Sequence, residues 1–134
     1  MKESPISYVL TLHLQGTASD GLRLVCGRSD HWYVDESSKY LKVQLRGEHT
    51  SGQGLDGFLG SSLNDHQPIW QAASKVGTAR TASVGILYEV EQHAMLTLGL
   101  GTDVMRRLCD LGFDLEMCAY PVAEDAEQNG KQQP

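Results

Sequence analysis

The chain has 134 residues, of which 40% are hydrophobic and 21% are charged, and these values are typical of one globular domain. They argue against a disordered chain, a coiled coil or a collagen-like repeat. No apolar run approaches the roughly 20 residues that span a bilayer, and the first residues lack the apolar stretch of a signal peptide. We therefore expect a soluble, cytoplasmic domain without membrane contact.

Negative charge is concentrated in the second part of the chain. The sequence has 11 Lys and Arg residues against 17 Asp and Glu residues, which gives a net charge of −6. Residues 1–80 are balanced, whereas residues 81–134 carry 3 basic and 9 acidic residues and hence the whole excess. The basic residues are scattered and form no patch that would favour nucleic acid. An acidic surface instead attracts a basic protein partner.

Strands are predicted where apolar and polar side chains alternate along the chain. The pattern marks five segments: residues 8–14, 40–46, 81–91, 95–100 and 115–120. Helices are predicted where apolar side chains recur with helical spacing next to a cap or a glycine stop. This second pattern marks four segments: residues 20–26, 55–63, 69–76 and 103–109. Residues 28–38 are polar and irregular around Trp32 and Tyr33.

The order of these elements predicts an α+β domain over residues 1–121. We expect a mostly antiparallel sheet of about five strands with helices packed on one face, as in a ferredoxin-like or related two-layer sandwich. Residues 122–134 are acidic and polar and offer little to bury, so a disordered tail is predicted there.

Residues 95–120 resemble a known family. Met95-Leu-Thr-Leu-Gly-Leu is followed by a short helix that contains Arg-Arg-Leu-Cys, by Leu-Gly, and by a strand that ends at Tyr120. This stretch resembles the ending of the bacterial domain-of-unknown-function family numbered 4279, whose members commonly carry a Trp in the early middle, where Trp32 stands here. The resemblance brings no catalytic residues. It implies a small stand-alone bacterial protein, of the kind often found as a toxin-neutralising immunity protein.

Neither a metal nor a cofactor is expected. The histidines are dispersed, and none pairs with another His or a Cys at ligand spacing. Cys26, Cys109 and Cys118 lack CxxC spacing and are interpreted as reduced, mostly buried thiols. No serine stands in a recognisable nucleophile motif. These features favour a protein that is not an enzyme.

Acidic and aromatic residues are the candidates for partner binding. Glu89 and Glu91 lie on one side of a predicted strand, and Asp114 and Glu116 lie near the last one. Aromatic side chains dominate the energetics of many interfaces. We therefore predict a binding surface made of two aromatic anchors and four acids: Trp32, Tyr33, Glu89, Glu91, Asp114 and Glu116. The leading hypothesis is an immunity-type protein that covers a basic toxin or effector with an acidic face.

Two alternatives remain open at this point. The segment Asp30–Glu36 could supply a general acid or base beside a stacking surface, which would indicate a small enzyme or a ligand-binding protein. The ordinary interpretation of this segment is a loop whose Trp32 fills the core. A deep pocket that encloses His31 with Asp35 or His49 would favour the ligand-binding alternative. The second alternative is a homodimer that pairs through an edge strand.

Overall fold

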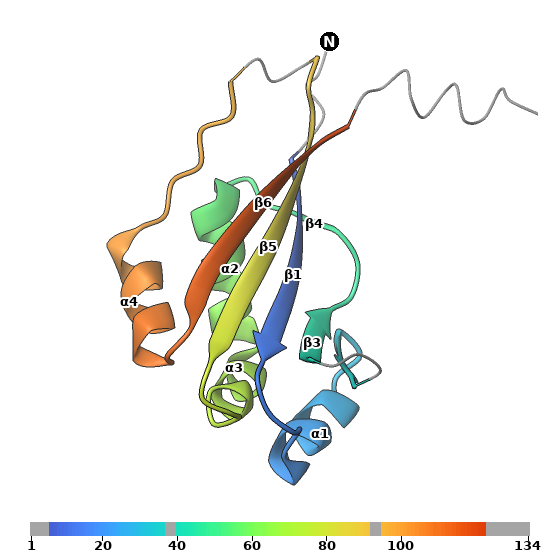
Figure 1. Cartoon of the computed structure of the whole chain (residues 1–134). Helices are drawn as coiled ribbons and strands as arrows, with labels where there is room; N and C mark the ends of the chain where they lie inside the picture. Colours follow the sequence, from blue (N-terminus) through green and yellow to red (C-terminus); the bar gives the residue numbers. More distant parts are fainter. Residues whose placement is uncertain (1–5, 37–39, 92–94, 123–134) are drawn as a thin grey trace, which may run out of the picture.

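A computed structural model describes residues 6–36, 40–91 and 95–122, and Figure 1 shows the arrangement of its elements. The strands are β1 (Ser7–Leu14), β2 (Trp32–Asp35), β3 (Leu41–Leu45), β4 (His49–Thr50), β5 (Arg80–Glu89) and β6 (Asp114–Val122). The helices are α1 (Asp20–Gly27), α2 (Gly54–Asp65), α3 (Gln67–Ala73) and α4 (Thr102–Asp110). The predicted α+β class is confirmed.

The strands form one sheet in the order β2-β3-β1-β5-β6, and β4 adds a short pairing to β1. All pairs are antiparallel except β5–β6, which is parallel from the Thr81–Asp114 pair to the Glu89–Val122 pair. A parallel pair needs a crossover connection, and α4 lies in that connection. The prediction of a mostly antiparallel sheet with helices on one face is therefore confirmed.

Alternation along the strands creates the core. Every second residue of β1, from Tyr8 to Leu14, is almost fully buried beneath the helices, and β5 buries Ala82, Val84 and Ile86 in the same way. The intervening residues face the opposite side and are half-buried. We call that opposite side the open face: it comprises the odd-numbered residues of β1, β2 and β5 and the even-numbered residues of β3 and β6.

The prediction of a strand at residues 95–100 is wrong. The alternation is real, because Leu96, Leu98 and Leu100 pack against the core and the residues between them are exposed. However, the segment pairs with no strand of the described chain. A short strand, β2, lies within the segment 28–38 that the sequence suggested to be irregular, and the two-residue β4 was not predicted. The predicted tail also begins too early, since Val122 is the last residue of β6, and residues 123–134 lie outside the described residues.

A hydrogen bond links α2 to the start of α4. The backbone N–H of Gly101, immediately before α4, donates to Oδ1 of Asp56 over 2.7 Å. Because α4 has no side-chain cap of its own at this end, the Asp56 carboxylate satisfies a donor that the helix leaves unpaired. This bond helps to fix the crossover that leads into β6.

Within the described residues, no helix is both long enough and apolar enough to cross a membrane.

Candidate functional site on the open face of the sheet

The strand register arranges the open face in rows that run across the sheet. One row consists of consecutive Cα partners: Tyr33, Gln44, Thr11, Ser83 and Glu116. The neighbouring row is formed in the same way: Asp35, Lys42, His13, Thr81 and Asp114. Lys42 on β3 is the one Lys or Arg in these two rows, and Asp35 lies beside it on β2, whereas two carboxylates stand on β6 at the other end.

Asp114 and Glu116 are the acids that the fold brings together. Both are exposed and project from β6 to the open face. Glu116 Oε1 accepts a hydrogen bond from Ser83 Oγ over 3.4 Å and a weak one from the Cys118 thiol over 3.9 Å. These contacts hold one carboxylate oxygen close to the sheet while the side chain remains accessible to a partner.

The other two predicted acids lie elsewhere. Glu89 is the last residue of β5, opposite Val122, and is separated from the Thr81–Asp114 pair by eight residues of strand, roughly 26 Å. Its Oε2 atom is buried and has no hydrogen-bond partner among the described residues. Glu91 is exposed and follows the end of β5. The four acids therefore do not form one cluster.

Trp32 is part of the core. Its side chain is 1% exposed and meets Trp70 edge to face, with ring centroids 6.4 Å apart, and His66 at 5.7 Å. The Trp32 backbone N–H donates to Ser29 Oγ over 3.2 Å. A partner cannot reach this indole without unfolding the edge of the sheet, so Trp32 does not serve as an interface anchor.

Two tyrosines supply the aromatic surface of the open face. Tyr33 is half-buried, its hydroxyl hydrogen-bonds to the Gln44 side chain, and the Arg46 guanidinium lies 4.6 Å from the ring centroid. Tyr120, which the sequence analysis did not select, is 54% exposed and lies over Gly85, where an added Cβ would be 3.3 Å from its ring. The alternation of β6 could have identified Tyr120, because it places Tyr120 on the same face of the strand as Glu116.

His13 connects the two halves of the open face. It lies between Lys42 and Thr81 in the register. Partial burial and then the nearby Lys42 charge lower the pKa of His13, and Glu116 opposes this shift. The shift favours the neutral form of the imidazole, which adds no positive charge to offset the β6 carboxylates.

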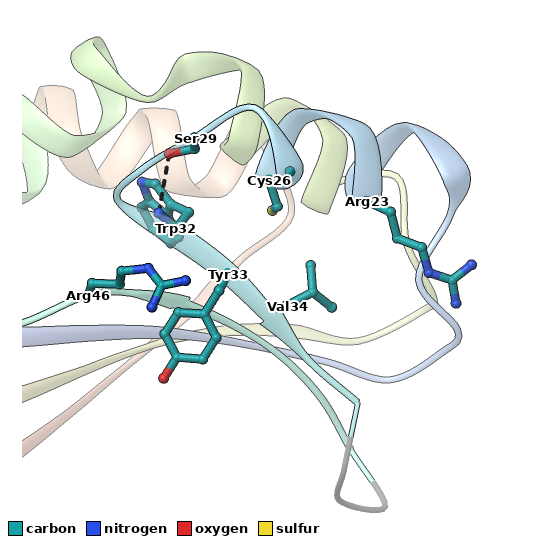
Figure 2. A pocket seen from close by; sticks show the side chains of 8 residues that line it. Arg23, Cys26, Ser29, Trp32, Tyr33, Val34 and Arg46 are labelled. Atoms are coloured by element: carbon teal, nitrogen blue, oxygen red, sulfur yellow. Dashed lines mark hydrogen bonds between the residues drawn. The ribbon is translucent and has the colours of Figure 1, made fainter.

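The segment Asp30–Glu36 borders a cavity of about 300 Å³ between the end of α1 and β2 (Figure 2). Its lining residues are Arg23, Cys26, Gly27, Ser29, Trp32, Tyr33, Val34 and Arg46. Arg23 is ion-paired with Glu36 over 2.8 Å. Burial raises the pKa of the Cys26 thiol to about 11, which keeps it protonated and unreactive. The cavity does not include His31, Asp35 or His49.

Three histidines converge that are far apart in sequence. The rings of His31 and His66 have centroids 5.7 Å apart, and His49 and His66 line a cavity of about 180 Å³ that also contains Asp65. Burial, together with His31 and His49, lowers the pKa of His66. Even so, no group of three or more His, Cys, Asp or Glu side chains among the described residues is arranged to hold a metal ion.

Comparisons of the chain with protein-family models, curated proteins and solved structures found no match. The fold and the open face define a class of protein: a two-layer α+β domain whose sheet is covered on one face and ends in a long edge strand. Because a fold alone does not specify a function, any function has to be argued from the side chains of this face.

Proposed function

We propose that the chain is a non-enzymatic protein-binding domain, and specifically an immunity-type protein that binds and neutralises a basic toxin or effector. The observation that carries this proposal is the side-by-side placement of Asp114, Glu116 and Tyr120 on one face of β6. Exposed carboxylates beside an exposed aromatic ring are the features that recognise a basic protein surface.

The chemistry of the two carboxylates suits the approach of a basic partner. Asp114 and Glu116 are exposed and remain hydrated in the unbound protein. They therefore attract Lys and Arg side chains of a partner during encounter. Lys42 on β3 and Arg46, which directly follows β3, disfavour basic groups on the other side of the sheet. The partner is therefore directed to the β5–β6 half of the open face.

Tyr120 supplies apolar contact at the same place. Its ring already lies against the backbone at Gly85, so binding immobilises a side chain that has limited freedom in the unbound protein. An aromatic residue beside a glycine in a sheet also protects the exposed backbone. We expect the ring to stack on the aliphatic part of a Lys or Arg side chain of the partner.

The test uses the product of the adjacent gene, co-expressed with the tagged chain and then titrated as a purified protein. We expect a stoichiometric complex that weakens as salt increases and suppression of the toxicity of the neighbour. The double substitution Asp114→Lys/Glu116→Lys should weaken binding at least about tenfold, which corresponds to about 1.4 kcal/mol. The charge-matched control is Asp30→Lys/Glu48→Lys, which changes exposed acids away from β6. Equal binding by both double variants, or no complex at all, would contradict the proposal.

The cavity between α1 and β2 supports a second candidate function, the binding of a small anion. Arg46 borders the cavity, and its guanidinium lies over the ring of Tyr33, while its backbone groups bond to His31 and His49. In NMR spectra of the isotope-labelled chain, titration with inorganic phosphate or with small carboxylates should shift the amide signals of Ser29 and Val34. Saturable shifts that Arg46→Ala abolishes would support this function, and unchanged spectra would exclude it for these anions.

A further inference from the structure

We propose that β6 pairs with β6 of a second copy of this chain, so that two sheets join edge to edge in a symmetric antiparallel dimer. This inference goes beyond the proposed function and does not depend on it. It stands on the backbone geometry of β6, on the apolar residues around it and on the self-complementarity of its sequence.

The backbone of β6 offers a free set of hydrogen-bonding groups. Val90 N–H donates to Val122 O, which fixes the phase of the β5–β6 ladder. In a parallel ladder, alternate residues of a strand direct both backbone groups to the same neighbour. The even-numbered residues of β6 therefore bond to β5, and Leu115, Met117 and Ala119 direct their N–H and C=O groups away from it. No described strand lies on that side.

Exposed apolar side chains are frequent in the last part of the described chain. Of the described residues, six of the eight large hydrophobic residues that are exposed lie between positions 90 and 122: Val90, Met95, Met105, Met117, Tyr120 and Val122. Three of these belong to β6, with Met117 on the helix side and Tyr120 and Val122 on the open face. A long edge strand with apolar side chains on both faces is a template for pairing with another chain.

The sequence of β6 is complementary to itself when the strands run antiparallel about Cys118, the midpoint of the strand. Met117 then lies opposite Ala119 of the partner subunit, so that a large side chain meets a small one. Glu116 lies opposite Tyr120 of the partner subunit, and no acid faces an acid. Pro121 has no N–H to donate, but it lies near the end of the paired region, so the central hydrogen bonds are retained.

The effect of salt distinguishes this dimer from the complex with a basic partner. Each copy carries a net charge of −6, so two copies repel one another and added salt should strengthen the dimer. The proposed complex with a basic protein responds in the opposite direction. Edge-to-edge pairing also leaves the open face uncovered and places both pairs of β6 carboxylates on one continuous surface. Failure of either proposal can therefore be recognised without reference to the other.

The first test is light scattering of the full chain in reducing buffer, from about 1 μM to about 1 mM and at low and high salt. We expect a monomer–dimer equilibrium that shifts towards dimer with concentration and salt. Ala119→Pro should abolish the dimer, because it removes an outward N–H while the β5–β6 hydrogen bonds remain. Met117→Lys should weaken the dimer at least tenfold by placing charges close to the two-fold axis. Leu24→Lys, at an exposed position of α1, is the matched control and should leave the dimer intact.

A second test fixes the register. In Cys109→Ser, the thiols of Cys118 in the two copies face one another and should form a disulfide when diamide is added as the oxidant. In Cys118→Ser, the exposed Cys109 should cross-link only at the slow rate of chance collisions. A chain that is monomeric at every concentration and salt, or a dimer that Leu24→Lys and Met117→Lys weaken equally, would overturn the proposal. A dimer without the Cys118 cross-link would overturn its register.

Discussion

The two edges of the sheet are built in opposite ways. The β2 edge has four residues, and α1 packs beside it. Its Trp32 extends into the core, and the Ser29 hydroxyl accepts the outward N–H of Trp32. The β6 edge has nine residues, most of them exposed on both faces. It is held mainly by its ladder with β5 and by the crossover through α4.

The two edges therefore have different roles: the β2 edge stabilises the fold, and the β6 edge is exposed to other molecules. At the β2 edge, Trp32 contributes to the core and is hidden from partners, so its removal should destabilise the protein strongly. Side chains at the β6 edge contribute little buried area and are free to contact another molecule. Natural sheets usually protect a long edge with charges, a proline or a covering element. Within β6 itself, the charged residues and proline are Asp114, Glu116 and Pro121, and Met117 and Ala119 at the centre of the strand are exposed.

Trp32→Ala should cause the largest loss of stability. The substitution removes a fully buried indole and its edge-to-face contacts with Trp70 and His66. We expect a decrease of roughly 3–5 kcal/mol in the free energy of unfolding. Urea denaturation followed by far-UV circular dichroism would measure it. A loss below about 1 kcal/mol would show that the β2 edge is not anchored by the core, and the contrast between the edges would fail.

Asp56→Ala should have a smaller effect, on the crossover that supports β6. It leaves the N–H of Gly101 without its carboxylate acceptor. Loss of a hydrogen bond to a charged group at a partly buried site should cost roughly 1–3 kcal/mol. Asp56→Asn retains an acceptor and should recover part of that loss in the same denaturation assay. Identical stabilities for the two variants would indicate that this hydrogen bond does not hold α4.

Lowering the pH should produce a modest loss of stability through His66. Burial, and then His31 and His49, lower the pKa of His66 below its ordinary value of 6.5, so the unfolded chain binds more protons just below pH 6.5. The folded state is therefore most stable above this range, and stability falls as the pH decreases through it. His13 acts in the same direction. Thermal melts at pH 7.5 and pH 5.5 should differ less for His66→Gln than for the unchanged chain, and an equal difference would contradict the assignment.

Met117→Lys should have the smallest effect on the stability of the monomer. The side chain is 48% exposed in spite of its position on the helix side of the sheet. We expect a change within about 0.5 kcal/mol in dilute solution, where dimers do not contribute. Denaturation at low micromolar protein would measure it. A loss as large as that of Trp32→Ala would mean that β6 is a core strand, and it would remove the distinction between the edges.

Alternation predicted the long strands because burial on one face imposes a period of two. The same rule failed at residues 95–100, where Leu96, Leu98 and Leu100 bury one side of an extended segment that pairs with no described strand. A period-two pattern reports one-sided burial and cannot distinguish a ladder from an extended chain lying on a core. The four residues of β2 are too few to produce a clear alternation among their polar neighbours.

The candidate site could be predicted in part. Asp114 and Glu116 were selected from the sequence, and β6 places both on the open face. Their distance from Glu89 depends on strand length and register, which one-dimensional spacing does not give. The convergence of His66 with His31 and His49 depends on how α2, α3 and β4 fold together, and no local pattern encodes it. Whether Trp32 is an anchor or a core residue depends on how α1 and α3 cover it.

Hydrogen exchange at individual backbone amides of β6 tests most directly whether this edge is the contact surface. The N–H groups of Leu115, Met117 and Ala119 face away from β5, and we predict that they exchange rapidly in dilute solution. Their protection should rise as the protein concentration increases, while Ala82 and Val84 at the centre of the sheet stay protected throughout. Rapid exchange of the three amides at every concentration, with new protection appearing only beside β2, would contradict the account.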